Sequence, residues 1–166
     1  QLIRAILDSS DQDLISLEEE REMLSRYLEL EALRFGGAMN FSVEIDSSLD
    51  VNTIGIPPML LQPIVENAVR HGLGPLQGRG QVVVQFDRSA HRLCIRIQDN
   101  GVGREFHQVH RHNRNMYGIA LTENRLASLT QQHGQPFSFQ ITDLFAPDKQ
   151  VTGTRVDFEL PILQLK

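Results

Sequence analysis

Two short stretches of this 166-residue chain constrain its fold more than any other feature. Residues 61–72 carry apolar side chains at helical spacing, with Glu66, Asn67 and His71 between them. Residues 97–103 read Ile-Gln-Asp-Asn-Gly-Val-Gly, which predicts a strand that runs into a glycine turn at Asp99. We interpret the helix and the strand end as two walls of one pocket, around which the other elements can be placed.

Composition limits the class of protein. With 40% hydrophobic and 22% charged residues, the chain suits one soluble domain with a substantial core. No apolar run approaches the roughly 20 residues that a membrane span requires. The net charge of -5 argues against a general nucleic-acid binder, and the single cysteine, Cys94, excludes an internal disulfide. An anionic ligand therefore needs a local basic patch, and residues 104–117 supply one.

The first half of the chain begins with helical patterns. Residues 1–15 have the pattern of the tail of a longer helix. Ser16 and Glu19 predict a capping box that begins a helix at Leu17, and Gly36 follows its end at about residue 35. The apolar side expected for this helix comprises Leu17, Leu24, Tyr27, Leu28, Leu30 and Leu33.

The rest of the chain alternates strands and helices. Strands are predicted over residues 41–46, 81–87, 92–98, 137–142 and 154–160. Helices are predicted over residues 57–71, with a kink near Pro63, and over residues 118–132. In the second helix Leu121, Leu126 and Leu129 are expected to face inward. The order predicts an α+β fold, a two-layer α/β sandwich with helices on one face of a mixed β-sheet.

Four polar residues of the first of these helices form the first candidate site. Asn67 and His71 are four residues apart and share a helix face, as do Glu66 and Arg70 beside them. Carboxamide and carboxylate oxygens suit Mg²⁺, which binds through few protein ligands and the phosphates of its substrate. The alternative is a solvated helix face that carries a Glu–Arg pair.

Three glycine-containing segments form the second candidate site. Asp99 precedes Gly101 and Gly103, where glycine permits a tight turn and close ligand approach, although an ordinary turn has the same sequence. Gly118 precedes a helix whose free amides would attract phosphate. Gly153 and Thr154 open the last strand, which is equally consistent with a simple strand entry. The spacing of His107, His110 and His112 gives no single helical face, which argues against zinc.

The order E-N-x-x-x-H, D-N-G-x-G, glycine before a helix, then G-T resembles the ATP-binding domain of the gyrase, Hsp90, histidine kinase and MutL (GHKL) superfamily. Within it, residues 57–72 are similar to the N box of the LytS/YehU-type sensor histidine kinases, and residues 16–36 resemble the segment before their catalytic domain. The resemblance covers nearly the whole chain. It implies a Bergerat fold, with the end of a dimerisation or linker region in residues 1–36 and the catalytic domain in residues 37–166.

The resemblance also implies roles for the first candidate site. Asn67 would hold Mg²⁺ against the phosphates of ATP, and Glu66 would orient or deprotonate the attacking imidazole. Arg70 and His71 would lie near the phosphates.

On the other wall, the resemblance implies that Asp99 binds the adenine amine while Gly101 and Gly103 shape that side. Residues 104–117 would form a short ATP lid, and Gly118 would begin the phosphate-facing helix. Gly153 and Thr154 would close the adenine side.

The sequence departs from the family pattern in the second glycine box and in its histidines. Ala120 replaces the second glycine of G-x-G-L-x-N, and Asn124 lies one place past the usual asparagine. No histidine of the chain has the Pro-His-Phe setting of the family's phosphoacceptor.

The function expected from the resemblance is transfer of the ATP γ-phosphoryl to a histidine upstream of this chain. The intact protein is expected to be a homodimer through upstream helices and to pass the phosphoryl to a response regulator of the LytTR type. The chain would be its cytoplasmic domain, in a bacterial inner-membrane protein. The alternatives are a degenerate nucleotide-binding, dimerisation or partner-docking module without kinase activity, and a self-contained ATPase of the MutL or gyrase kind.

Overall fold

The computed structural model describes residues 14–104 and 115–165. The predicted helix tail before residue 14 and the segment 105–114, which holds most of the basic patch and His107, His110 and His112, lie outside the described residues. Within the part that is described, no helix combines the length and apolarity needed to cross a membrane.

A five-stranded mixed sheet in the order β2-β4-β5-β7-β6 is the centre of the fold. The β2–β4 pair is parallel, and the other three pairs are antiparallel. These strands are β2 (Met39–Ile45), β4 (Gly80–Ser89), β5 (Arg92–Asp99), β6 (Ser138–Phe145) and β7 (Val151–Pro161). The five predicted strands are therefore present, each within a few residues of its predicted bounds.

A second, small sheet was not predicted from the sequence. It has the order β1-β3-β8 and pairs β1 (Ile15–Ser16), β3 (Ile54–Ile56) and β8 (Leu163–Gln164) antiparallel. Strands of two or three residues carry too little alternation to be recognised in a sequence. The small sheet ties the start of the first helix to the end of the last long strand.

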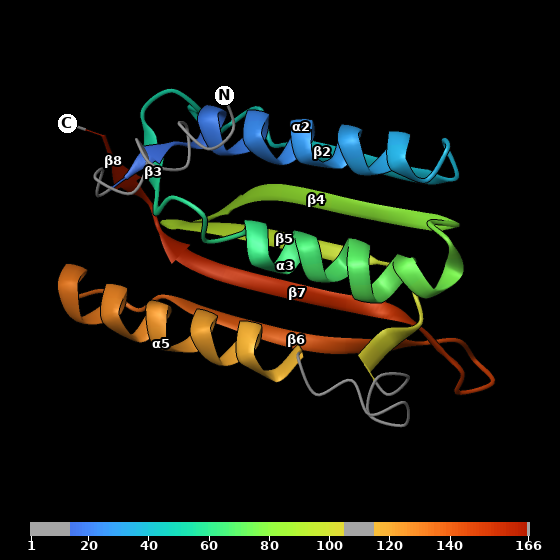
Figure 1. The fold of residues 1–166 in the computed structure, drawn as a ribbon. Coiled ribbons are helices and arrows are strands. Elements are labelled where there is room, and N and C mark those ends of the chain that lie inside the picture. Colours follow the sequence, from blue (N-terminus) through green and yellow to red (C-terminus); the bar gives the residue numbers. More distant parts are fainter. Residues whose placement is uncertain (1–13, 105–114, 166) are drawn as a thin grey trace.

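The helices lie over one face of the large sheet, as Figure 1 shows. They are α2 (Leu17–Arg34), α3 (Gln62–Asn67) and α5 (Asn115–His133), and α3 continues into the π-helix η1 (Ala68–Leu73) and the 3₁₀-helix η2 (Gly74–Leu76). The predicted two-layer sandwich is confirmed. Its core lies between the helices and rows such as Phe86, Ile95 and Phe158, which pair across β4, β5 and β7.

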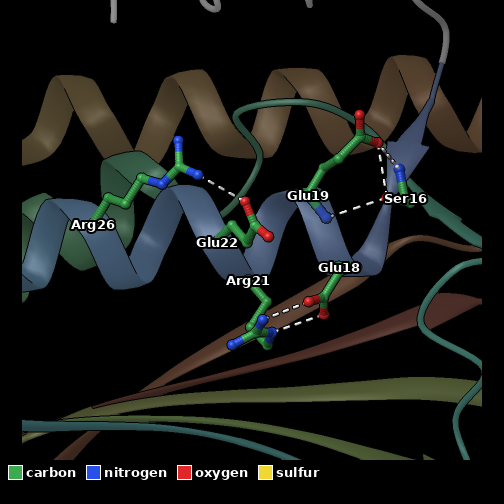
Figure 2. A network of polar contacts seen from close by, with 6 residues as sticks. All are labelled: Ser16, Glu18, Glu19, Arg21, Glu22 and Arg26. Carbon is green, nitrogen blue, oxygen red and sulfur yellow. Dashed lines mark hydrogen bonds and ion pairs between the residues drawn. The ribbon is translucent and has the colours of Figure 1, made fainter.

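Helix α2 begins at the predicted capping box (Figure 2). The Glu19 amide donates to Ser16 Oγ at 3.1 Å, and the Ser16 amide donates to Glu19 Oε2 at 2.8 Å. Ion pairs of Arg21 with Glu18 and of Arg26 with Glu22 follow along the helix (Figure 2).

The predicted apolar side of α2 is only partly correct. Leu17, Leu24 and Leu28 are buried, but Leu30 and Leu33 are 59% and 76% exposed. Leu30 was wrongly assigned because two residues along a helix turn the side chain through about 200°, and this places Leu30 almost opposite Leu28.

Helix α3 begins later than predicted, at Gln62 instead of Pro57. Met59 adopts a φ of 57°, a left-handed conformation that cannot belong to a right-handed helix. Pro63 therefore falls in the first turn, where its missing N–H has no helical partner to lose and where no preceding helical turn is present for it to kink. The π-turn extends the helix through Arg70 and His71 to Leu73.

Helix α5 differs from its prediction at its start and on one face. The described part of the helix runs from Asn115, so Gly118 lies within the helix and does not precede it. Leu126 and Leu129 are buried as predicted, but Leu121 is 68% exposed. Thr122 is the buried residue instead, because it precedes Leu126 by one helical turn and shares its face.

Candidate functional site

A polar row crosses one end of the helix-covered face of the sheet. Asp99 of β5 pairs with Thr154 of β7, which in turn pairs with Asp143 of β6. Each lies four residues along its strand from the apolar row that holds Ile95 and Phe158, so all three positions face the helix layer. The sheet thus replaces core side chains by carboxylates and a hydroxyl at this end.

Asp99 is nearly enclosed, with 5% of its surface exposed. Its Oδ1 accepts a hydrogen bond of 2.9 Å from the Gly101 amide across the turn. Burial raises the pKa of Asp99 to about 6, the amides of Gly101 and Thr154 lower it, and the nearby Asp143 carboxylate raises it further. The carboxylate is a hydrogen-bond acceptor held in place by the backbone of its own loop.

Glycines allow three segments to meet at Asp99 without side chains between them. A Cβ atom added at Gly72, in η1, would lie 2.7 Å from Asp99 Oδ1. A Cβ atom at Gly101 would overlap the Gly72 carbonyl, and one at Gly153 would overlap the Asp99 carbonyl. The Val102 amide also donates to the Gly72 carbonyl at 3.1 Å. The end of the N box, the D-N-G-V-G loop and the start of β7 are therefore in direct backbone contact.

The predicted N-box residues lie along α3 and η1, upstream of this contact. Asn67 is half-buried at the end of α3, and the neighbouring Glu66 accepts from Gln62 Nε2 at 3.0 Å. In η1, Arg70 is exposed and His71 is half-buried. Five residues separate Asn67 from Gly72, or about 7 Å along the helix axis, so the amide and the Asp99 carboxylate belong to the same end of the domain.

A tyrosine of α2 lies beside the N box. Burial raises the pKa of Tyr27 to about 12, with Glu31 and Glu66 acting in the same direction and Arg70 against them. Its hydroxyl is buried and has no hydrogen-bond partner among the described residues. Helix α2 thus lies near the N-box helix at Tyr27.

The structure describes only some of the other predicted site residues. A Cβ atom at Gly103, whose φ is 71°, would overlap the Val151 side chain, so Gly103 lies against the start of β7. Arg104 donates to both Asp143 oxygens, at 2.9 and 2.7 Å, and is the one member of the basic patch placed before residue 115. In Figure 1 the end of β5 and the β6–β7 connection lie at the same end of the sheet.

Three residues of this region were missed by the sequence analysis. Gly72 follows His71 directly, and its position beside the conspicuous helix was the available signal. Asp143 and Arg125 gave none, because each acquires its role from partners far away in the sequence: Arg104 for Asp143, and the carbonyls of Pro58 and Met59 for Arg125.

The donor set fits Mg²⁺ brought in with a nucleotide, since that ion needs only one or two protein oxygens when phosphates supply others. Across residues 14–104 and 115–165, no group of three or more histidine, cysteine or acidic residues could hold a metal ion without such help.

Comparison with known proteins agrees with this geometry. The chain is 32% identical over 176 aligned residues to the sensor protein LytS of Oceanobacillus iheyensis, an alignment that covers 100% of this chain and 28% of the relative. The nucleotide-free catalytic domain of histidine kinase ThkA superposes with a TM-score of 0.60 at 12% identity, covering 90% of this chain and 95% of that one. Full-length ShkA in complex with AMPPNP gives a TM-score of 0.60 at 15% identity and covers 93% of this chain and 32% of that one. No protein-family model matches the chain.

The chain is a relative of the LytS-type sensor histidine kinases and has the fold of a histidine kinase catalytic domain. This bears out the family resemblance and the fold class. The chain spans 28% of the length of this LytS relative, so most of the relative lies outside the aligned region.

Proposed function

We propose that this chain is the ATP-binding catalytic domain of a two-component sensor histidine kinase, which transfers the γ-phosphoryl of ATP to a histidine upstream in the intact protein. The contact between Gly72 and Asp99 carries the proposal. It joins the end of the N box to the D-N-G-V-G loop, and these are the two motifs on which nucleotide binding in this family would depend.

Asp99 is the proposed acceptor for the adenine amine. Its carboxylate is held by the Gly101 amide, and the buried setting strengthens a hydrogen bond to a ligand donor. Gly101 and Gly103 shape this wall, because a side chain at either position would meet backbone or Val151. Gly153 and Thr154 close the adenine side from β7.

The phosphates are proposed to lie along the N box. Asn67 would hold Mg²⁺, which when bound neutralises phosphate charge. Arg70, His71 and the amides near Gly118 would bind phosphate oxygens. Glu66, beside Asn67, would orient or deprotonate the attacking imidazole. Catalysis would come mainly from positioning and charge stabilisation.

The remaining features of the intact protein belong to the proposal. Residues 1–36 would end a dimerisation or linker region, and residues 37–166 would form the catalytic domain, although α2 packs into the same core as the sheet. The intact protein would be a homodimer at the inner membrane of a bacterium with this domain in the cytoplasm. It would pass its phosphoryl group to a response regulator, of the LytTR type.

Calorimetric titration of the 166-residue chain with AMPPNP tests the proposal. We expect binding that strengthens with Mg²⁺, and loss of that Mg²⁺ dependence in Asn67→Ala. Absence of binding by the wild-type chain would reject the proposal. Binding without autophosphorylation of the intact protein would favour the alternative of a nucleotide-binding module that lacks kinase activity.

A further inference from the structure

A buried carboxylate on α2 is not used by the site described above. Glu20 has 1% of its surface exposed and shares the inward face of α2 with Leu17, Leu24 and Leu28. Neither carboxylate oxygen has a hydrogen-bond partner of normal geometry among the residues that the structure describes. Burying an unpaired carboxylate opposes folding, so the groups around Glu20 matter for the stability of the domain.

The carboxylate faces the turn that begins the N-box helix. Burial raises the pKa of Glu20 to about 7, whereas the Leu61 amide, the Arg125 guanidinium and the Met59 amide lie near enough to lower that pKa in part. The amide groups of this turn are therefore presented to an acidic side chain of α2. This turn contains the left-handed Met59, with a φ of 57°.

The carbonyl groups of the same turn accept hydrogen bonds from a side chain of α5. Arg125 donates from Nη1 to the Met59 carbonyl at 3.0 Å and from Nη2 to the Pro58 carbonyl. Within the described ranges Glu20 and Arg125 form no close ion pair, but their opposite charges attract each other, because Arg125 lowers the pKa of Glu20. The two side chains also act on different groups of the turn. One side presents an acceptor to amides, and the other presents donors to carbonyls.

The position of this turn affects both proposed phosphate-binding elements. Asn67 lies five residues into the helix that starts after the turn, at Gln62. Gly118 lies seven residues before Arg125 in α5, which is close to two helical turns on the same face. A movement of α2 that displaced Glu20 would therefore change where α3 begins relative to α5.

We propose that Glu20 and Arg125 are positioning residues that clamp the Met59 turn from α2 and α5, so that the helix preceding the catalytic sheet sets the placement of the N box relative to α5. This inference rests on the proposed kinase function. It gives α2 a role in phosphoryl transfer that does not require α2 to touch ATP.

The test compares variants of the intact kinase in two assays, the Kd for AMPPNP with Mg²⁺ and the autophosphorylation rate. Glu20→Leu removes the carboxylate with a side chain suited to the core, and Glu20→Gln keeps the shape and an acceptor oxygen. The control is Glu22→Gln, at an exposed ion pair on the same helix. Arg125→Met and the double variant with Glu20→Leu complete the set.

We expect Glu20→Leu to lower the autophosphorylation rate about tenfold, with Kd changed less than about threefold, and Glu20→Gln to restore most of the rate. Arg125→Met should lower the rate similarly, and the double variant should lose less than the product of the two effects. A rate for Glu20→Leu equal to that of Glu22→Gln would overturn the inference. The inference would also be overturned if Glu20→Leu lost nucleotide affinity and folded protein in parallel, or if Glu20→Gln did not restore the autophosphorylation rate.

The two assays distinguish failure of the positioning role from failure of the proposed kinase function. A wild-type protein that binds nucleotide and phosphorylates itself, with an unaffected Glu20→Leu variant, rejects only the positioning role. A wild-type protein that does neither rejects the kinase proposal and this inference together.

Discussion

Asp99 and Glu20 are both buried carboxylates, but the structure holds them in opposite ways. Asp99 accepts from the Gly101 amide at 2.9 Å and lies where three backbone segments meet. Glu20 has no such bond and lies among leucines in the helix layer. Burial raises the pKa of Asp99 to about 6 and that of Glu20 to about 7.

The two settings suit the two carboxylates to different roles. A carboxylate fixed by its own loop is rigid and keeps further acceptor capacity for a ligand. A carboxylate between packed helices responds to how those helices lie, because its nearest donors belong to other elements. The first arrangement suits recognition, and the second suits coupling between elements.

The largest effect is expected from breaking the backbone contact at Asp99. Gly101→Ala forces a Cβ atom into the Gly72 carbonyl, which should lower the free energy of unfolding by about 3 kcal/mol and weaken nucleotide binding. Urea denaturation measures the first and calorimetry the second. Gly74→Ala is the matched control, because its Cβ atom would meet only the Val69 carbonyl at an ordinary 3.7 Å. Equal stability of the two variants would contradict the contact.

A smaller effect is expected from the pH dependence that Glu20 contributes. Its pKa is raised in the folded state, from 4.5 to about 7. The corresponding stability is complete below about pH 4.5 and is lost as the pH rises through about 7. Between pH 6 and pH 8 the wild-type protein should lose about 1 kcal/mol from this group.

Glu20→Gln should remove that loss, whereas Glu22→Gln should retain it. Urea denaturation at pH 6, 7 and 8 provides the comparison, since the three proteins differ only at the substituted residue. A Glu20→Gln variant with the wild-type slope would mean that Glu20 is not held in the buried, proton-retaining state.

The smallest effect is expected at Asp143, which sharpens the account of Asp99. Removing its charge by Asp143→Asn should lower the pKa of Asp99, because the Asp143 carboxylate raises it. The stability change should stay below about 1 kcal/mol, since the Arg104 partner is partly exposed. NMR titration of the Asp99 carboxyl carbon measures the shift.

Asp157→Asn is the control for this titration, because Asp157 is also ion-paired to arginine but faces away from the helix layer. A shift of the Asp99 pKa in the control as large as that in Asp143→Asn would remove Asp143 from the account.

Local signals in the sequence predicted much of the fold and of the candidate site. The Ser16–Glu19 box, the five long strands and the D-N-G-V-G turn depend on neighbouring residues, and each is present in the structure. The roles assigned to the site residues remain predictions, but the structure brings Asp99, Gly101 and Gly153 into one cluster.

What the sequence analysis missed depends on contacts between distant segments. The left-handed Met59, which delays the start of α3, is held by Arg125, 66 residues further along the chain. Glu20 had a usable signal, because it lies three residues after Leu17 and four before Leu24 and so falls on the apolar side of α2. Because Glu20 is charged and follows two other glutamates, it was not assigned to the buried side.

Calorimetric titration of Asp99→Asn with AMPPNP and with the guanine analogue GMPPNP, both with Mg²⁺, tests directly whether Asp99 recognises adenine. Asp87→Asn, at an exposed aspartate of β4, is the control. We expect the wild-type chain and the control to prefer the adenine nucleotide. Asp99→Asn should lose at least about tenfold in affinity for it, or 1.4 kcal/mol, together with that preference. Unchanged affinity and unchanged preference in Asp99→Asn would contradict adenine recognition by Asp99.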